Sequence, residues 1–250
     1  MDSSARSSVP SPDVDAFEWS AHEGVLFDLD GVITPTATIH EEAWAELFAA
    51  YEYTAADYIT SIDGRPRYDG VRTFLSSRDI ELPGGDPADP PGDGTVCALG
   101  NRKNALFNAL LERKGVAPYP GSVATIELLE GLGIPSAIVS SSKNARTVLR
   151  GAGLADRFDV VVDGVVAAEE HLAGKPAPDA FLLGASRLGV RPSRTVVVED
   201  AVSGVAAGAA GGFAVVIGVD RGAGADALID HGATFVVDDL DRLLPTGDSA

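Results

Sequence analysis

The sequence predicts an α/β protein of the doubly wound type, with a parallel sheet and a helical insertion after the first strand. Short apolar runs that end in acidic or small polar residues recur along the chain, and such runs are typical of strands buried on both faces. Helical patterns lie between most of them, as in a doubly wound domain. Only helical patterns fill the long stretch between the first two runs.

The apolar runs predict six strands, and the segments between them predict helices. The strands are expected at Val25–Asp28, Ala137–Ser140, Val160–Asp163, Val196–Glu199, Ala214–Ile217 and Phe235–Asp238. Amphipathic helices are expected at Ser122–Leu132, Ser142–Leu149 and Asp179–Leu188. Each of these helices is followed by glycine, which favours a helix end, and Ser142 is a suitable N-cap.

Residues 37–118 form the predicted insertion, which we expect to be a small helical domain of its own. Its helical patterns lie at Glu41–Tyr53, Tyr68–Arg78 and Arg102–Lys114, and Glu81–Thr95 is a loop rich in Pro, Gly and Asp. The predicted organisation is therefore a disordered tail at 1–22, a catalytic core at 23–36 and 119–245, and the insertion at 37–118.

Composition limits the classes of function. The 250 residues are 45% hydrophobic and 22% charged, as in a soluble globular protein. With 19 Lys and Arg against 37 Asp and Glu, the net charge of −18 disfavours nonspecific binding to nucleic acid and to anionic membranes. The uncharged stretch Ala201–Val219 is interpreted as a helix and a buried strand rather than a membrane span. The single cysteine, Cys97, cannot form an intrachain disulfide and is expected to be an inert thiol, which suits the cytoplasm.

The carboxyl ends of the predicted strands carry a set of polar side chains typical of phosphoryl transfer. Ligands bind at these ends in parallel α/β sheets. Carboxylates from two strands can hold Mg²⁺, while a lysine and hydroxyl groups can stabilise charge on the transferring oxygens. The set consists of Asp28, Asp30, Ser140, Ser141, Ser142, Lys143, Asn144, Glu169, Lys175, Glu199 and Asp200. Each piece alone also fits a turn or a helix cap, but their common position at successive strand ends favours a site.

These motifs resemble those of the haloacid dehalogenase superfamily over residues 24–244. The shared motifs are Asp28-Leu29-Asp30-Gly31-Val32, Ser140, Lys175-Pro176 and Glu199-Asp200. The resemblance implies a Rossmann-like core with an inserted α-helical cap domain. Within the superfamily the chain is most similar to the β-phosphoglucomutase family. That similarity rests on Asp28–Ala37, His40, Ala43-Trp44, Gly64-x-x-Arg67, Arg102-Lys103-Asn104, Ser140-x-Ser142-Lys143-Asn144 and Lys175–Asp179.

The resemblance implies a role for each matching residue of the core. Asp28 is expected to be the nucleophile that forms an aspartyl-phosphate, and Asp30 the general acid and base. Asp28, the backbone carbonyl of Asp30, and Asp200 are expected to bind Mg²⁺, with Glu199 as a further or outer ligand. Ser140 and Lys175 are expected to hold the transferring phosphoryl group.

The remaining matches imply contacts with the rest of the substrate. Arg67, Ser142, Lys143 and Asn144 are expected to bind the phosphate at the other end of a sugar. His40 and Lys103 are expected to contact the substrate or to position Asp30. From the residues alone, His40 could instead begin a helix, and Arg67 and Lys103 could be solvated surface charges.

The chain departs from the family pattern at Thr34-Pro35-Thr36, where the family usually has Asp between the threonines. Proline fixes φ and removes a backbone donor in the presumed linker to the cap, which affects the expected closing motion.

The function predicted from this resemblance is a cytoplasmic, Mg²⁺-dependent mutase. It would interconvert β-glucose 1-phosphate and glucose 6-phosphate through a glucose 1,6-bisphosphate intermediate. A sugar-phosphate phosphatase with the same aspartyl-phosphate is the alternative. A dehalogenase is disfavoured because it needs no proton donor at Asp30, and a non-enzymatic sensor because no expected carboxylate is missing. The sugar and the oligomeric state are not determined by the sequence.

Overall fold

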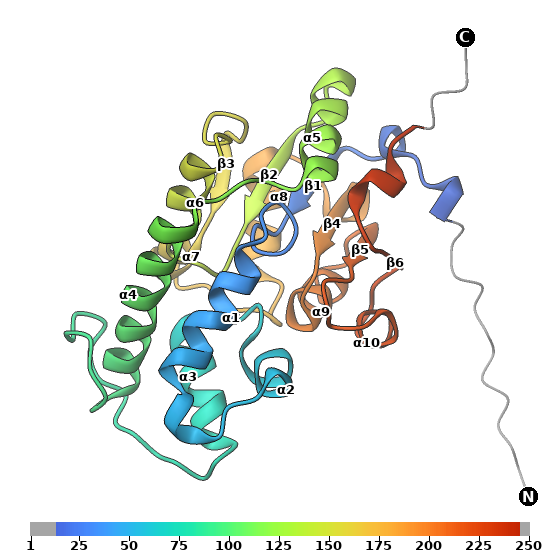
Figure 1. Ribbon diagram of the computed structural model, residues 1–250. Helices are drawn as coiled ribbons and strands as arrows, with labels where there is room; N and C mark the ends of the chain where they lie inside the picture. Colours follow the sequence, from blue (N-terminus) through green and yellow to red (C-terminus); the bar gives the residue numbers. More distant parts are fainter. Residues whose placement is uncertain (1–13, 246–250) are drawn as a thin grey trace, which may run out of the picture.

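A computed structural model describes residues 14–245 of the chain (Figure 1). Its centre is a parallel sheet of six strands in the order β3-β2-β1-β4-β5-β6. The strands are β1 (Gly24–Phe27), β2 (Ser136–Val139), β3 (Val160–Val162), β4 (Thr195–Glu199), β5 (Val215–Val219) and β6 (Phe235–Val237). All six predicted strands are present, and the α/β fold class is confirmed.

Both faces of the sheet are buried, as the continuous apolar runs predict. Alternate residues of β1 belong to different hydrophobic clusters: Val25 and Phe27 pack on one side, and Leu26 on the other. The first cluster includes residues of α5 (Pro120–Leu132) and α6 (Ala145–Gly151). The second includes residues of α8 (Asp179–Leu188), α9 (Val202–Ala210) and α10 (Ala225–Asp230). A short helix, α7 (Gly164–Glu169), follows β3. Neither α7 nor α10 was expected from the sequence.

The insertion after β1 is helical, as predicted, and lies over the carboxyl ends of the strands (Figure 1). It contains α1 (Thr36–Leu47), α2 (Ala55–Asp57), a π-helical turn (Tyr58–Ile62), α3 (Arg67–Ser76) and α4 (Val96–Lys114). These elements share a cluster of their own that includes Trp44, Phe48 and Phe74. Ile39 of α1 and Phe107 of α4 belong instead to the core cluster that contains Val25 and Phe27 of β1. We propose that the boundaries between core and cap lie at residues 36/37 and 118/119.

Three expected helix starts are corrected by the structure. Helix α1 begins at Thr36 rather than Glu41, directly after Pro35, whose fixed φ suits the first turn of a helix. Helix α4 begins at Val96 rather than Arg102, because the Thr95 hydroxyl accepts a hydrogen bond from the Ala98 amide and caps it. Helix α6 begins at Ala145, since Ser142 caps the Asn144 amide within the preceding turn.

The prediction that the N-terminal tail is disordered is wrong for residues 14–22. Trp19 is buried, and its indole N–H donates to the Leu243 carbonyl at 3.0 Å, so this segment packs against the C-terminal part of the chain. Phe17 stacks edge-on against Trp19 and Phe235. The remaining tail residues lie outside the described part. Within residues 14–245, no helix is long and apolar enough to cross a membrane.

Candidate active site

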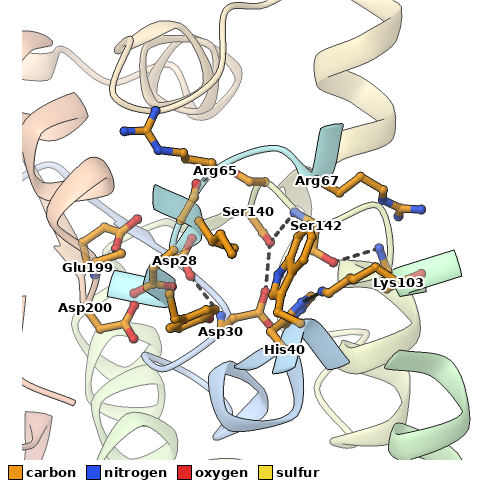
Figure 2. Close-up of a pocket in the computed structure, with 18 of the residues that line it drawn as sticks. Asp28, Asp30, His40, Arg65, Arg67, Lys103, Ser140, Ser142, Glu199 and Asp200 are labelled. Carbon is orange, nitrogen blue, oxygen red and sulfur yellow. Dashed lines mark hydrogen bonds and ion pairs between the residues drawn. The ribbon is translucent and has the colours of Figure 1, made fainter. Parts of the chain in front are cut away.

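A pocket between the sheet and the cap collects most of the residues that the sequence singled out (Figure 2). The core side contributes the segments that follow β1, β2 and β4, and the cap side contributes α1, the loop before α3, and α4. The predicted site residues that line it are Asp28, Asp30, His40, Arg67, Lys103, Ser140, Ser142, Asn144, Glu199 and Asp200. Lys175 does not line the pocket itself, but its ammonium donates a hydrogen bond to Asp28. Lys143 does not line the pocket either, and its ammonium lies 5.5 Å from the centroid of the Tyr68 ring.

Asp28 follows β1 and is held between backbone and side-chain donors. Its amide donates to the Val198 carbonyl of β4 at 2.9 Å, and its Oδ2 accepts from the Asp30 amide at 2.9 Å. The Lys175 ammonium donates to Asp28 Oδ1 at 2.5 Å and to Glu199 Oε1 at 2.6 Å. These contacts fix the orientation of the Asp28 carboxylate at the carboxyl edge of the sheet, and a fixed orientation suits a nucleophile.

Lys175 is the buried cation of an acidic centre. The carboxylates of Asp28 and Glu199 raise its pKa above the usual range despite burial, so its ammonium is charged at neutral pH. Burial raises the pKa of Asp28, and the Lys175 charge opposes that shift. One buried lysine therefore faces several carboxyl groups in this centre.

The Glu199 carboxylate forms its main contacts with groups of the protein itself. Its Oε1 accepts from the lysine, and its Oε2 accepts from the Ala201 amide at 2.8 Å. The carboxylate also lies tightly against Gly204, where a Cβ would collide with it. Both oxygens are thus engaged within the protein, and the lysine and Gly204 crowd the carboxylate, which favours an outer rather than a direct role for Glu199 at a metal.

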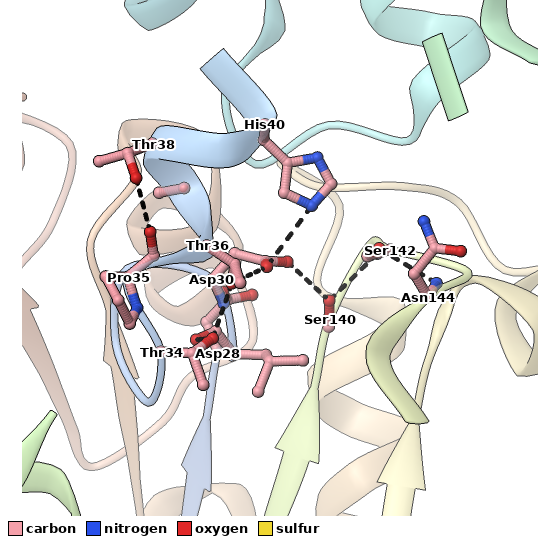
Figure 3. Close-up of polar contacts among 12 residues, drawn as sticks. Asp28, Asp30, Thr34, Pro35, Thr36, Thr38, His40, Ser140, Ser142 and Asn144 are labelled. Atoms are coloured by element: carbon pink, nitrogen blue, oxygen red, sulfur yellow. Dashed lines mark hydrogen bonds and ion pairs between the residues drawn. The ribbon is translucent and has the colours of Figure 1, made fainter. Parts of the chain in front are cut away.

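Asp30 is the second carboxylate of the pocket and faces the cap (Figure 3). The Thr36 hydroxyl donates to its Oδ1 at 2.5 Å, and His40 Nε2 lies 3.5 Å from the same oxygen. Burial raises the pKa of Asp30, but the positive charge and hydrogen bonds supplied by His40, Thr36 and Lys103 outweigh it, and the pKa is lowered. Asp30 is therefore ionised and able to accept a proton from a substrate hydroxyl.

His40 and Lys103 form a buried pair behind Asp30. The Lys103 ammonium contacts His40 Nδ1 and lies 5.0 Å from the centroid of the Trp44 ring. Burial, followed by repulsion from Arg67, lowers the pKa of Lys103 to about 7, and burial also lowers the pKa of His40. Since both pKa values are lowered, the pair does not carry two positive charges at neutral pH. The alternative in which Lys103 is solvated is wrong, because its side chain is buried.

Arg67 begins α3 and brings a guanidinium to the far end of the pocket. It forms no ion pair with any carboxylate of residues 14–245, and burial lowers its pKa. On the same side, the Asn144 amide group donates to Asn104 Oδ1 at 2.7 Å and links the core to α4. A partly buried cation without an anionic partner is suited to bind a phosphate.

Sequence reasoning missed four cap residues that line the pocket: Tyr58, Ile62, Asp63 and Arg65. Burial and the nearby charges of Glu199 and Asp30 raise the pKa of Asp63 to about 6. Asp63 precedes Gly64, the first residue of the matched Gly64-x-x-Arg67 motif, and that adjacency was the available signal. Tyr58 lies in a π-helical turn and carried no recognisable signal.

The acidic centre fits a hard divalent cation, although side chains alone do not form a ready-made site. Within the described residues, no group of three His, Cys, Asp or Glu side chains is arranged to hold a metal. The expected set, however, combines Asp28 and Asp200 with the backbone carbonyl of Asp30. Burial and the charges of Asp63, Glu199 and Asp28 raise the pKa of Asp200 well above its usual range. Crowded buried carboxylates of this kind are stabilised by a bound Mg²⁺.

The comparison with protein families agrees with this geometry. Residues 22–212 match the family described as haloacid dehalogenase-like hydrolase. The chain belongs to this family. β-Phosphoglucomutase of Mycobacterium bovis is 52% identical to it over 88% of this chain and 90% of that protein. Hexitol phosphatase A of Escherichia coli is 31% identical over 78% of this chain and 82% of that protein.

Solved structures of this haloacid dehalogenase-like family support the same assignment. A crystal structure of β-phosphoglucomutase from Clostridium difficile superposes with a TM-score of 0.74 at 26% identity, covering 89% of this chain and 93% of that one. The predicted resemblance is therefore confirmed, and the chain is a β-phosphoglucomutase-like enzyme with phosphatases among its relatives.

Proposed function

We propose that this enzyme is a Mg²⁺-dependent β-phosphoglucomutase that interconverts β-glucose 1-phosphate and glucose 6-phosphate. The observation that carries the proposal is the polarity of the pocket. Its core end holds Asp28 and Asp30, whereas its cap end holds the guanidinium of Arg67, which has no ion-pair partner among residues 14–245. A substrate with a phosphate at each end, such as glucose 1,6-bisphosphate, fits this arrangement. The 52% identity to β-phosphoglucomutase of Mycobacterium bovis supports it further.

In the proposed reaction, the Asp28 carboxylate carries the phosphoryl group as an aspartyl-phosphate. The sugar hydroxyl oxygen attacks phosphorus, its proton passes to Asp30, and the bond between phosphorus and Asp28 breaks. The bisphosphate then reorients in the pocket, so that its other phosphate faces Asp28. Asp28 takes back the other phosphoryl group while Asp30 returns the proton to the departing sugar oxygen.

The surrounding residues stabilise charge during these transfers. Lys175 and Ser140 lie beside the two catalytic carboxylates and are proposed to hold the transferring phosphoryl oxygens. Asp28, Asp200 and the carbonyl of Asp30 are proposed to hold Mg²⁺, which supplies positive charge that offsets repulsion between Asp28 and the phosphoryl group. Arg67, Ser142, Lys143 and Asn144 are proposed to bind the other phosphate.

A sugar-phosphate phosphatase is the second candidate, and the 31% identity to hexitol phosphatase A favours it. The same aspartyl-phosphate would then be transferred to water. The two functions are separated by incubating the enzyme with β-glucose 1-phosphate, Mg²⁺ and a trace of glucose 1,6-bisphosphate. We expect glucose 6-phosphate to form without stoichiometric release of inorganic phosphate. Release of phosphate with no glucose 6-phosphate would overturn the mutase proposal, and the Asp28→Asn variant controls for contaminating activity.

A further inference from the structure

The cap loop Asp63–Arg67 is held against the core by two serine hydroxyl groups. We propose that Ser141 and Ser203 are positioning residues that hold this loop closed over Asp28. In the closed state the phosphoryl group passes to a sugar hydroxyl rather than to water. This second part rests on the proposed mutase function, whereas the first part does not.

The two hydrogen bonds have normal lengths and approach the loop from different parts of the core. The Ser141 hydroxyl donates to the Gly64 carbonyl at 2.7 Å, and the Ser203 hydroxyl donates to the Asp63 carbonyl at 2.9 Å. Ser141 follows β2 and Ser203 lies in the first turn of α9 after β4. Since β1 lies between β2 and β4, the two serines hold the loop on both sides of the strand that carries Asp28.

The backbone of the loop fits tightly against the core at these points. Gly64 has a φ of +69°, and a Cβ there would collide with the Ser203 hydroxyl and lie 3.0 Å from the Ala201 methyl group. At the next contact, a Cβ on Gly174 would collide with the ring of Pro66. Glycine is therefore required on both sides of the interface, and the contact depends on the exact position of the loop backbone.

Both serines bind main-chain carbonyls, so the side chains of the loop are left available to a ligand. Asp63, Arg65 and Arg67 all line the pocket from this one segment. Closing the loop therefore brings the Arg67 guanidinium into place and covers the acidic centre in a single movement. Closure that excludes water and completes a site is a common use of such loops.

The chemical consequence is a choice between two acceptors. When a sugar hydroxyl attacks, its oxygen forms the new bond to phosphorus, Asp30 takes the proton, and the Asp28 carboxylate leaves. When water attacks, inorganic phosphate forms and the Asp28 carboxylate is regenerated in the same way. A loop that opens more often admits water more often, so weaker serine contacts increase hydrolysis relative to mutase turnover.

The closing role can be tested without any assay of activity. Spin labels at Ile59 of the cap and Ile229 of α10, both exposed, report the distance between cap and core in a Cys97→Ala background. We expect one dominant distance in the presence of glucose 6-phosphate. Each of Ser141→Ala and Ser203→Ala should increase the population at other distances about fivefold, as expected for the loss of one hydrogen bond. An unchanged distance distribution in the double variant would overturn the proposal.

The effect on acceptor choice is tested by measuring glucose 6-phosphate and inorganic phosphate together in the same variants. The ratio of phosphate release to mutase turnover should rise about tenfold in the double variant, with KM for β-glucose 1-phosphate rising as well. Ser→Thr at both positions should restore the ratio, and Ser186→Ala, an exposed change on α8, is the matched control. A changed distance distribution with an unchanged ratio would refute the role in acceptor choice. A wild-type enzyme without mutase activity would refute the proposed function and leave the closing role standing on the distances.

Discussion

Replacing Lys175 by methionine tests the electrostatics of the acidic centre. The lysine is buried, with 3% of its surface exposed, and its ammonium donates to Asp28 at 2.5 Å and to Glu199 at 2.6 Å. Methionine has a similar length but leaves both carboxylates buried without their cation. Removing one partner of a buried ion pair costs about 3–5 kcal/mol. We expect the free energy of unfolding of Lys175→Met to fall by that amount at pH 8, and activity to be lost.

The pH dependence of this deficit follows from the direction of the Asp28 shift. Burial raises the pKa of Asp28, and loss of the lysine removes the main interaction that opposes the rise. When the pKa of a carboxyl group is higher in the folded than in the unfolded protein, the folded state becomes less stable as the pH rises above the pKa in the unfolded protein, about 3.9. The deficit of the variant should therefore be smaller at pH 5 than at pH 8.

Urea unfolding at both pH values, in a metal-free buffer, measures the deficit. Lys114→Met is the matched control, because Lys114 forms an exposed ion pair with Glu42 and its loss should cost less than about 1 kcal/mol. A deficit below about 1 kcal/mol for Lys175→Met at pH 8, or one that does not decrease toward pH 5, would refute this account of the centre.

Four further predictions concern the reaction. Asp28→Asn should reduce turnover to below about 1% of the wild-type rate, because an amide cannot form the acyl-phosphate; several per cent of residual activity would exclude Asp28 as the nucleophile. A chelator should abolish turnover and Mg²⁺ should restore it, whereas full activity of verified metal-free protein would contradict the metal role. Pro35→Asp should change kcat and KM together in steady-state assays if the segment before α1 absorbs the closing motion; unchanged kinetics would locate that motion elsewhere. Arg67→Ala should cost the mutase reaction about 2–4 kcal/mol in kcat/KM, with far less effect on hydrolysis of a small phosphate monoester; equal losses would argue against binding of a second phosphate.

Much of the core followed from the sequence because its signals are local. The apolar run Val196–Val198 places consecutive side chains on opposite faces of the sheet, so only burial on both sides accommodates it. Parallel strands then bring the residues after each run to one edge, which is why Asp28, Ser140 and Asp200 could be expected together. Helix starts were less accurate because they depend on hydrogen bonds that periodicity does not reveal, such as those accepted by the Thr95 and Ser142 hydroxyl groups.

The sequence by itself determined the α/β class, the order of the strands along the chain and the residue types at the carboxyl edge of the sheet. Only the tertiary structure decided how the charges in the pocket are distributed. Lysine is usually an exposed residue type, yet Lys103 packs between His40 and Trp44 and is buried, and this burial lowers its pKa to about 7. Likewise, Ser203 contacts the Asp63 carbonyl across 140 residues of sequence. Such contacts depend on how the cap packs against the core, and no local pattern encodes the distance between two segments that meet only after folding.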